Sequence, residues 1–276
     1  MDSALIQLFT QLSDRKSMTM VRDTTASREE NSLRHFKTVA FLGSSSTAGK
    51  GQAFDWIGEL RKRPRNCCYD FQNFGTGGDL AYNALQRLAG VLKSRPQIAI
   101  VWIGANDVLA MTFPNFDRFV RRWKRPPEKP SAELFQRSLQ IITHRLKNET
   151  SARIGLCSLA PIGEDLRSTD PFQSALNHHA RDFSAIIRDW ALEEGVGYIP
   201  VYETMIANMQ NSPRHAFTSL RFLPFYRDAL RVLALRKHPD EVARLNGWQF
   251  HTDGVHMNSR SGMIVANLVQ EFIDLC

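Results

Sequence analysis

Residues 38–50 have the sequence TVAFLGSSSTAGK, an apolar run that passes directly into glycine and small hydroxyl residues. The apolar part is long enough for one buried strand, and the residues after it favour a tight turn into a helix. Further apolar runs of strand length follow at residues 68–71, 98–103, 154–159 and 197–201. Several of these runs are almost wholly apolar, as expected for a parallel sheet that is covered on both faces.

Helical periodicity appears between and after these runs. Apolar residues recur three and four apart in residues 54–63, 80–93, 132–146, 171–194 and 259–275. This alternation of strands and helices predicts an α/β protein, a three-layer α/β/α sandwich with a parallel sheet. We expect one domain over residues 37–276, preceded by a polar leader at residues 1–36.

Two stretches interrupt the repeat and are interpreted as insertions. Residues 112–131 are rich in proline and basic residues and are predicted to form a long irregular loop. Residues 208–248 form the longer insertion, with a helix predicted over 225–237. On a helical wheel one face carries Phe225, Ala229, Leu230, Val232 and Leu233, and the other carries Arg227, Asp228 and Arg231. The pattern fits a helix packed on the domain, or a lid that offers apolar side chains to a lipid or acyl substrate.

Composition and charge limit the classes of partner. Hydrophobic residues make up 43% of the chain and charged residues 23%, an ordinary mixture for a globular protein. The net charge of +7 favours anionic partners such as acidic substrates or lipid headgroups. The basic residues lie in separate groups and no nucleic-acid motif accompanies them, so nucleic acid is not an expected partner.

Cysteine usage and hydropathy bear on the compartment. Cys67, Cys68, Cys157 and Cys276 match neither a disulfide framework nor a zinc-knuckle spacing. No window reaches the apolar length of a membrane span, and the first 37 residues lack the features of a secretory signal. We expect a cytoplasmic protein without a transmembrane segment, for which peripheral membrane contact stays open.

Four short segments carry groups suited to acyl transfer. They are Gly43–Lys50, Asn73–Asp79 and Gly104–Asp107, each after a predicted strand, and His251–Asn258 before the last helix. The carboxyl ends of parallel strands meet at one edge of a sheet, where ligands bind. Each segment alone could be a helix cap or a turn. Together they supply a hydroxyl nucleophile, donors for an oxyanion, and a histidine with a carboxylate three residues before it.

The same segments allow two other chemistries. Gly43, Gly49 and Lys50 nearly match a phosphate loop, but Gly51 stands where a serine or threonine should bind Mg²⁺. A metal site built from His251, Asp253 and His256 lacks a fourth ligand of recognisable spacing. We therefore expect no cofactor and no metal. A non-catalytic binding module that keeps the fold is a further alternative.

The four segments, in their order along the chain, resemble the four sequence motifs of the SGNH hydrolases, which are also called the GDSL-like lipases and esterases. The resemblance implies Ser45 as the nucleophile, with Asp253 and His256 as the acid and base. It also implies an oxyanion hole formed by the N–H groups of Ser45 and Gly78 and the side chain of Asn106. The implied fold is flavodoxin-like, with five parallel strands in the order 2-1-3-4-5. Ser44 replaces the usual aspartate of the family, so we expect altered loop hydrogen bonds with activity retained.

The resemblance implies serine-dependent hydrolysis of a small-molecule carboxylic ester. The apolar helix and the basic surface favour a lipid, either a fatty-acyl ester or a lysophospholipid. A thioesterase, a sugar O-acetyl esterase and an acyltransferase would use the same residues and remain alternatives. The substrate itself does not follow from the resemblance, because the insertions lie outside the common core of the family.

Overall fold

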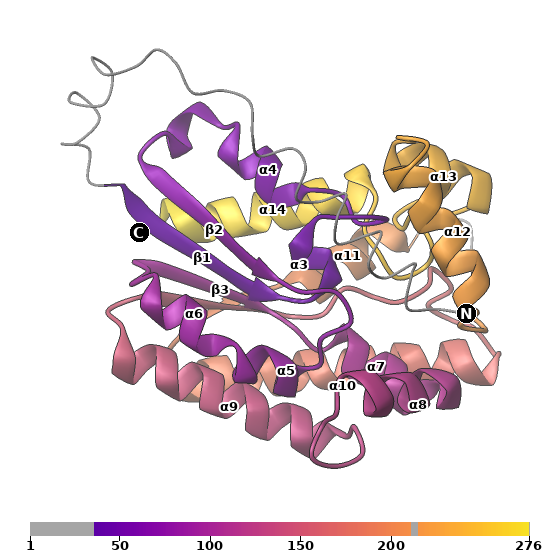
Figure 1. The fold of residues 1–276 in the computed structure, drawn as a ribbon, viewed down its shortest axis with the longest axis horizontal. Coiled ribbons are helices and arrows are strands. Elements are labelled where there is room, and N and C mark those ends of the chain that lie inside the picture. Colours follow the sequence, from indigo (N-terminus) through magenta and orange to yellow (C-terminus); the bar gives the residue numbers. More distant parts are fainter. Residues whose placement is uncertain (1–35, 211–214, 276) are drawn as a thin grey trace, which may run out of the picture. The chain divides into compact units, whose positions relative to one another are not determined.

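A computed structural model describes residues 36–210 and 215–275 of the chain. One parallel sheet has the strand order β2-β1-β3-β4-β5 (Figure 1), which confirms the predicted α/β class and topology. Its strands are β1 Lys37–Gly43, β2 Tyr69–Gly75, β3 Ile98–Trp102, β4 Arg153–Cys157 and β5 Gly197–Ile199. The register pairs Gly43 with both Gly75 and Trp102, so the first three strands end at the same level. The loops that follow these strands therefore start side by side.

Helices cover both faces of the sheet because side chains alternate along each strand. On β1, Val39 and Phe41 pack into one core, and Ala40 and Leu42 pack into the other. The first core is covered by α4 Trp56–Arg61, α11 Val201–Met209 and α14 Ser259–Asp274. The second is covered by α5 Ala81–Gln86, α6 Leu88–Lys93, α7 Ala105–Thr112, α9 Ala132–Glu149 and α10 Pro171–Glu193. Figure 1 shows α14 and α9 on opposite sides of the sheet.

Each of the five predicted helical segments contains a helix, and α7 is a helix that was not predicted. Residues 80–93 form two short helices, α5 and α6, that meet at Arg87. The helices α11 and α13 Pro239–Asn246 were not predicted, because each is short and lies next to proline. Pro64–Asn66 adds a 3-10 turn. No helix within the described residues is both long and apolar enough to cross a membrane.

The prediction of a long irregular loop over residues 112–131 was wrong. Residues 114–123 form α8, Pro114–Trp123, in which Phe116 and Val120 are buried. Pro114 occupies the first turn of the helix, where a missing N–H removes no hydrogen bond. Within the stretch only Phe113 and residues 124–131 lie outside a helix, and residues 124–131 hold the other three prolines.

The helix predicted over 225–237 is α12, Phe222–Leu233, and its predicted orientation was wrong. Asp228, expected on the polar face, is 4% exposed, whereas Leu230 and Leu233 are 54% and 57% exposed. Asp228 accepts hydrogen bonds from Arg231 at 2.9 Å and from Asn246 at 2.8 Å. These bonds offset the cost of burying the carboxylate. Of the predicted leader, all but Phe36 lies outside the described residues, as do residues 211–214 of the second insertion.

Candidate active site

The turn after β1 presents Ser45 at the edge of the sheet. Ser45 begins the short helix α3, Ser45–Ala48. A Cβ atom on Gly43 would lie 2.0 Å from Oγ1 of Thr47 and 2.5 Å from the carbonyl oxygen of Trp102, so only glycine fits this turn. Gly49 ends the helix with φ 63°. The segment thus differs from a phosphate loop, in which the glycine and lysine lead into a helix.

Ser45, His256 and Asp253 form one chain of hydrogen bonds. Oγ of Ser45 lies 2.9 Å from Nε2 of His256, although 211 positions separate the two residues in the sequence. Nδ1 of His256 lies 2.8 Å from Oδ2 of Asp253. Oδ1 of Asp253 accepts from the backbone N–H groups of Val255 and His256, at 3.0 and 2.9 Å. This geometry leaves Nε2 of His256 facing the Ser45 hydroxyl, as a general base requires.

The electrostatics of this pair favour an ionised Asp253. Burial alone would raise the pKa of the Asp253 carboxyl, but the charge and hydrogen bond of His256 oppose this effect. Together with the N–H groups of Val255 and His256, they hold the pKa of Asp253 below its usual value. An ionised Asp253 keeps the proton of the imidazole on Nδ1 and leaves Nε2 free to accept one.

The two further residues assigned to the oxyanion hole line the same cavity as Ser45 and His256. Gly78 has φ 74°, a left-handed conformation that glycine adopts without strain. The Asn106 side chain is buried, and its Nδ2 donates to the carbonyl oxygen of Asp79 at 2.9 Å. This bond uses one of the two amide hydrogens and orients the other. Ser44, in contrast, makes no capping hydrogen bond to α3 with its side chain.

Sequence reasoning missed two cations that hold the loop after β2. Arg87 donates to Oδ2 of Asp79 and to the carbonyl oxygens of Phe74 and Gly43, the latter two at 2.7 and 2.9 Å. Lys124 donates to Oδ1 of Asp79 at 2.7 Å. These contacts connect the ends of β1 and β2 to Asp79, whose carbonyl oxygen orients the Asn106 side chain. The only signal in the sequence was the basic character of the surrounding segments.

The Asn106 amide is expected to contribute to catalysis through the developing oxyanion. In Asn106→Ala we expect kcat on a p-nitrophenyl ester to fall about 10²–10³-fold, with a small change in KM. Steady-state kinetics would test this, with the exposed Asn208→Ala as the matched control. An unchanged kcat in Asn106→Ala would remove this side chain from the oxyanion hole.

Next to Asn106, Asp107 is a fully buried carboxyl. Its Oδ2 accepts from the backbone N–H of Ala81 at 3.1 Å, and its Oδ1 has no hydrogen-bond partner. Burial raises the pKa of Asp107 to about 7, which the bond from Ala81 only partly opposes. A raised pKa means that the folded chain holds a proton which the unfolded chain releases near pH 4.

This pKa predicts a pH-dependent stability. Asp107 makes its full contribution to the free energy of unfolding below about pH 4. This contribution, about 4 kcal/mol, is lost as the pH rises through about 7. Asp107→Asn keeps an acceptor for Ala81 and removes the titration. We expect the variant to gain free energy of unfolding over the wild type as the pH rises from about 5 to about 8. Urea unfolding at both pH values measures this. A difference in free energy of unfolding between variant and wild type that is the same at both pH values would contradict the prediction.

The loop that carries Asp253 and His256 is anchored by a buried carboxylate that the sequence did not reveal. Glu164 accepts from the backbone N–H groups of Gln249, Phe250 and His251, at 2.7 to 3.1 Å. Nδ1 of His251 lies 3.0 Å from Oε1 of Glu164, and Nε2 lies 2.9 Å from the carbonyl oxygen of Pro161. His251 therefore supports the loop with both ring nitrogens. Within the part of the chain that the structure describes, no group of three metal-binding side chains converges.

Glu164→Gln is expected to destabilise the fold strongly. The side-chain amide would point an N–H at groups that are themselves donors, and His251 would lose its buried partner. We expect a loss of about 3–5 kcal/mol in the free energy of unfolding and a drop of about 10 °C in Tm. Thermal unfolding, with the exposed Glu149→Gln as control, measures this. Equal Tm values for the two variants would refute the anchoring role.

Residues from the two predicted insertions meet beside Ser45 and His256 and line a cavity of about 290 Å³. Its apolar lining comprises Leu109, Phe116, Phe119, Leu220, Phe222, Phe225, Tyr226 and Val255. Phe119 packs against Phe222 with ring centroids 5.4 Å apart, and Asn115 donates to the carbonyl oxygen of Leu220 at 2.6 Å. The ring of Phe225 lies 5.2 Å from that of His256. The cavity therefore joins an apolar chamber to the Ser45 hydroxyl.

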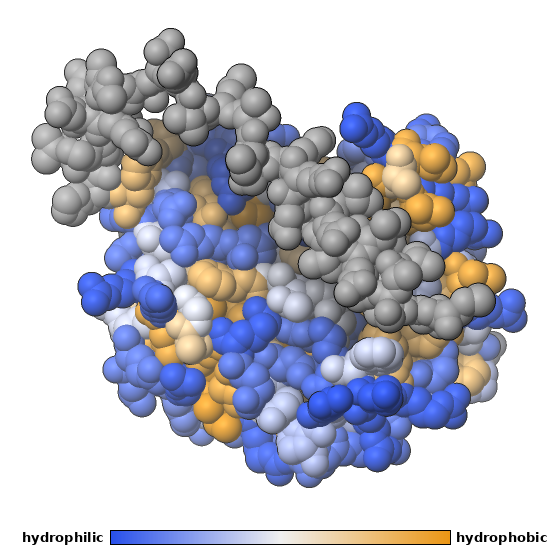
Figure 2. Space-filling model, in the orientation of Figure 1, coloured by the Kyte–Doolittle hydropathy of each residue, from blue (hydrophilic) through white to orange (hydrophobic). Residues whose placement is uncertain are grey.

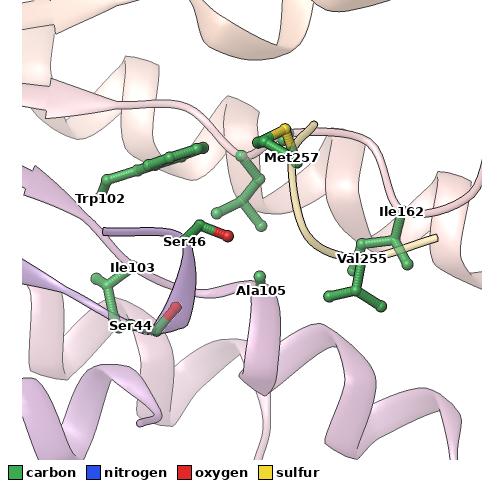
Figure 3. A pocket seen from close by; sticks show the side chains of 10 residues that line it. Ser44, Ser46, Trp102, Ile103, Ala105, Ile162, Val255 and Met257 are labelled. Atoms are coloured by element: carbon green, nitrogen blue, oxygen red, sulfur yellow. The ribbon is translucent and has the colours of Figure 1, made fainter. Parts of the chain in front are cut away.

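A second cavity, of about 20 Å³, lies behind the turn that holds Ser45. Figure 3 shows the Ser46 hydroxyl pointing into it, with Ile162, Val255 and Met257 on its other side. A space of this size has room for one water molecule. Ser45 does not line it, so the larger cavity is the one suited to a substrate.

A comparison with known protein families identifies the family of the chain. A family model described as the GDSL-like Lipase/Acylhydrolase family matches residues 41–222, a range that includes Ser45, Gly78 and Asn106 and ends before Asp253. A search of curated protein sequences found no match.

Several solved structures have a similar fold. An acetyl xylan esterase is 20% identical over 86% of this chain and 99% of its own, with a TM-score of 0.58. An acetylxylan esterase from Geobacillus stearothermophilus is 15% identical over 87% and 96%, with a TM-score of 0.57. A GDSL-like lipase from Bacteroides thetaiotaomicron is 16% identical over 90% and 95%, with a TM-score of 0.55.

Proposed function

Because this chain belongs to the GDSL-like lipase/acylhydrolase family, we propose that it hydrolyses fatty-acyl esters through an acyl-enzyme on Ser45. In this mechanism Nε2 of His256 accepts the Ser45 proton while Oγ attacks the ester carbonyl carbon. The N–H groups of Ser45 and Gly78 and the amide of Asn106 stabilise the oxyanion. His256 then protonates the leaving alcohol. A water molecule next gives a proton to His256 and attacks the acyl carbon. The bond to Oγ of Ser45 breaks, His256 returns the proton to Oγ, and the fatty acid leaves.

The apolar cavity beside Ser45 is the observation that supports a fatty-acyl group as the substrate's acyl part. Its volume of about 290 Å³ is near the lower end of the range typical of small-molecule sites, roughly 300–1,000 Å³. Its aromatic and aliphatic lining offers a long acyl chain the burial that stabilises binding by about 0.8 kcal/mol per methylene. A lysophospholipid would place its acyl chain there and its phosphate near Lys50, which lines the same cavity.

An acetyl ester is the second candidate. Two of the similar structures are named as acetylxylan esterases, and an acetyl group needs no apolar chamber. A thioester substrate, or an alcohol in place of water as the acceptor, would use the same catalytic groups. Analysis of the products would identify transfer to an alcohol.

A series of p-nitrophenyl esters from acetate to palmitate tests the proposal. We expect kcat/KM to rise from acetate toward longer chains by about three- to fourfold per methylene while the chamber fills. Phe116→Ala should flatten this rise, because it removes part of the apolar wall. A maximum at acetate in the wild type would contradict the fatty-acyl assignment and favour the O-acetyl esterase.

A further inference from the structure

The outward face of α12 is apolar. Leu223, Tyr226, Leu230 and Leu233 are 82%, 61%, 54% and 57% exposed. Their spacing of three, four and three residues puts them in one line along the helix. We call these four residues the outer stripe. A helix on the surface of a protein ordinarily turns such a line toward the core.

Polar contacts on the inward face hold this orientation. Asp228 is buried under α12 and accepts from Arg231 at 2.9 Å and from Asn246 of α13 at 2.8 Å. Gln52, from the loop after α3, donates to the carbonyl oxygen of Phe225 at 2.7 Å. Rotating the helix to bury the leucines would break the hydrogen bonds from Asn246 and Gln52, the two that join α12 to other parts of the chain. The outward position of the outer stripe is therefore built into the fold.

The surroundings of the outer stripe are apolar and basic. Leu235, just after α12, and Leu245, in α13, are also exposed, at 64% and 60%. Figure 2 shows hydrophobic residues gathered over α12 and α13 with hydrophilic ones around them. Residues 221–237 contain five basic residues and one acidic residue, a net charge of +4. The single acidic residue is the buried Asp228. Arg231 and Lys237 pair with Asp228 and Glu241. Residues 221–246, which include α13, contain six basic and three acidic residues, so the net charge around the outer stripe is still positive.

We propose that the outer stripe docks on an anionic lipid bilayer. Its apolar side chains would enter the boundary between headgroups and acyl chains, and the arginines beside it would meet lipid phosphates. A second copy of this chain is a poorer occupant, because two identical faces with this positive charge would repel each other. The inward side of the same helix lines the catalytic cavity through Phe222 and Phe225, so docking would bring the cavity to the membrane surface.

Co-sedimentation of the full chain with vesicles tests the docking surface. The vesicles are phosphatidylcholine alone, or equimolar phosphatidylcholine and phosphatidylglycerol. We expect binding to the anionic vesicles that weakens at high salt, and weaker binding to the neutral ones. The double variant Leu230→Gln, Leu233→Gln should bind at least about tenfold more weakly. Leu192→Gln is the matched control, because Leu192 is 83% exposed near the carboxyl end of α10.

Three results would overturn the proposal. One is binding of the double variant equal to that of the wild type, with circular dichroism spectra that match. Another is a wild type that binds neither kind of vesicle. The third is a dimer in light scattering that the double variant dissociates, since a second copy would then occupy the face. The inference rests on the proposed function only for the lipid nature of the substrate. Ser45→Ala separates the two, because it should lose esterase activity and still sediment with anionic vesicles.

Discussion

Ser45→Ala is expected to lower kcat on p-nitrophenyl esters by at least about 10⁴-fold. The variant removes the oxygen that lies 2.9 Å from Nε2 of His256, so no other group can form the acyl-enzyme at that position. The alanine fits without strain in the first turn of α3, and KM should change little, because the cavity walls stay in place.

The turn itself provides the control for this variant. Ser46 is the next residue, and its hydroxyl points into the small cavity, which Ser45 does not line (Figure 3). Ser46→Ala should therefore keep nearly all activity. A fluorophosphonate probe should label the wild type and Ser46→Ala but not Ser45→Ala. Equal labelling or equal turnover in Ser45→Ala would eliminate Ser45 as the nucleophile. A wild type that the probe fails to label would instead favour the binding-module interpretation.

Asp253→Asn should lower kcat by about 10³–10⁴-fold with the fold intact. The asparagine carbonyl can take the place of Oδ1 and accept from the N–H groups of Val255 and His256. Its NH₂ group then faces Nδ1 of His256, where Oδ2 had accepted. The imidazole must place its proton on Nε2, which can no longer take the proton of Ser45.

The expected signature of Asp253→Asn is a low kcat with an unchanged Tm and KM. The exposed Asp189→Asn, a change of the same chemistry far from the site in sequence, controls for the loss of one charge. Activity within about tenfold of the wild type would show that Asp253 does not orient the base. A large fall in Tm would assign the residue to the folding of the loop instead.

Much of the framework was predictable because its signals are local. The apolar run before Gly43 and the similar runs after it predicted the strands, and their order followed from the resemblance and was confirmed. The segments with Ser45, Gly78, Asn106 and His256 were recognised from residues within a few positions of one another. The structure brings all four to one cavity, and their catalytic roles remain predictions for the variants above.

The parts that were missed depend on contacts between distant residues. Proline in residues 112–131 suggested a loop, but Pro114 starts α8 and Phe116 completes a wall against the second insertion. Glu164 carried no motif, because its partners are backbone groups 85 to 87 positions later.

By itself, the sequence determined the sheet, its layers and the chemistry available at one edge, because periodicity and turn preferences act over a few residues. Only the tertiary structure decided which way α12 faces. A helical wheel counts Asp228 as a surface residue, and it cannot include Asn246, whose amide offsets part of the cost of burying that carboxylate. That bond spans 18 positions and turns the leucines of α12 outward, beside the cavity that holds Ser45.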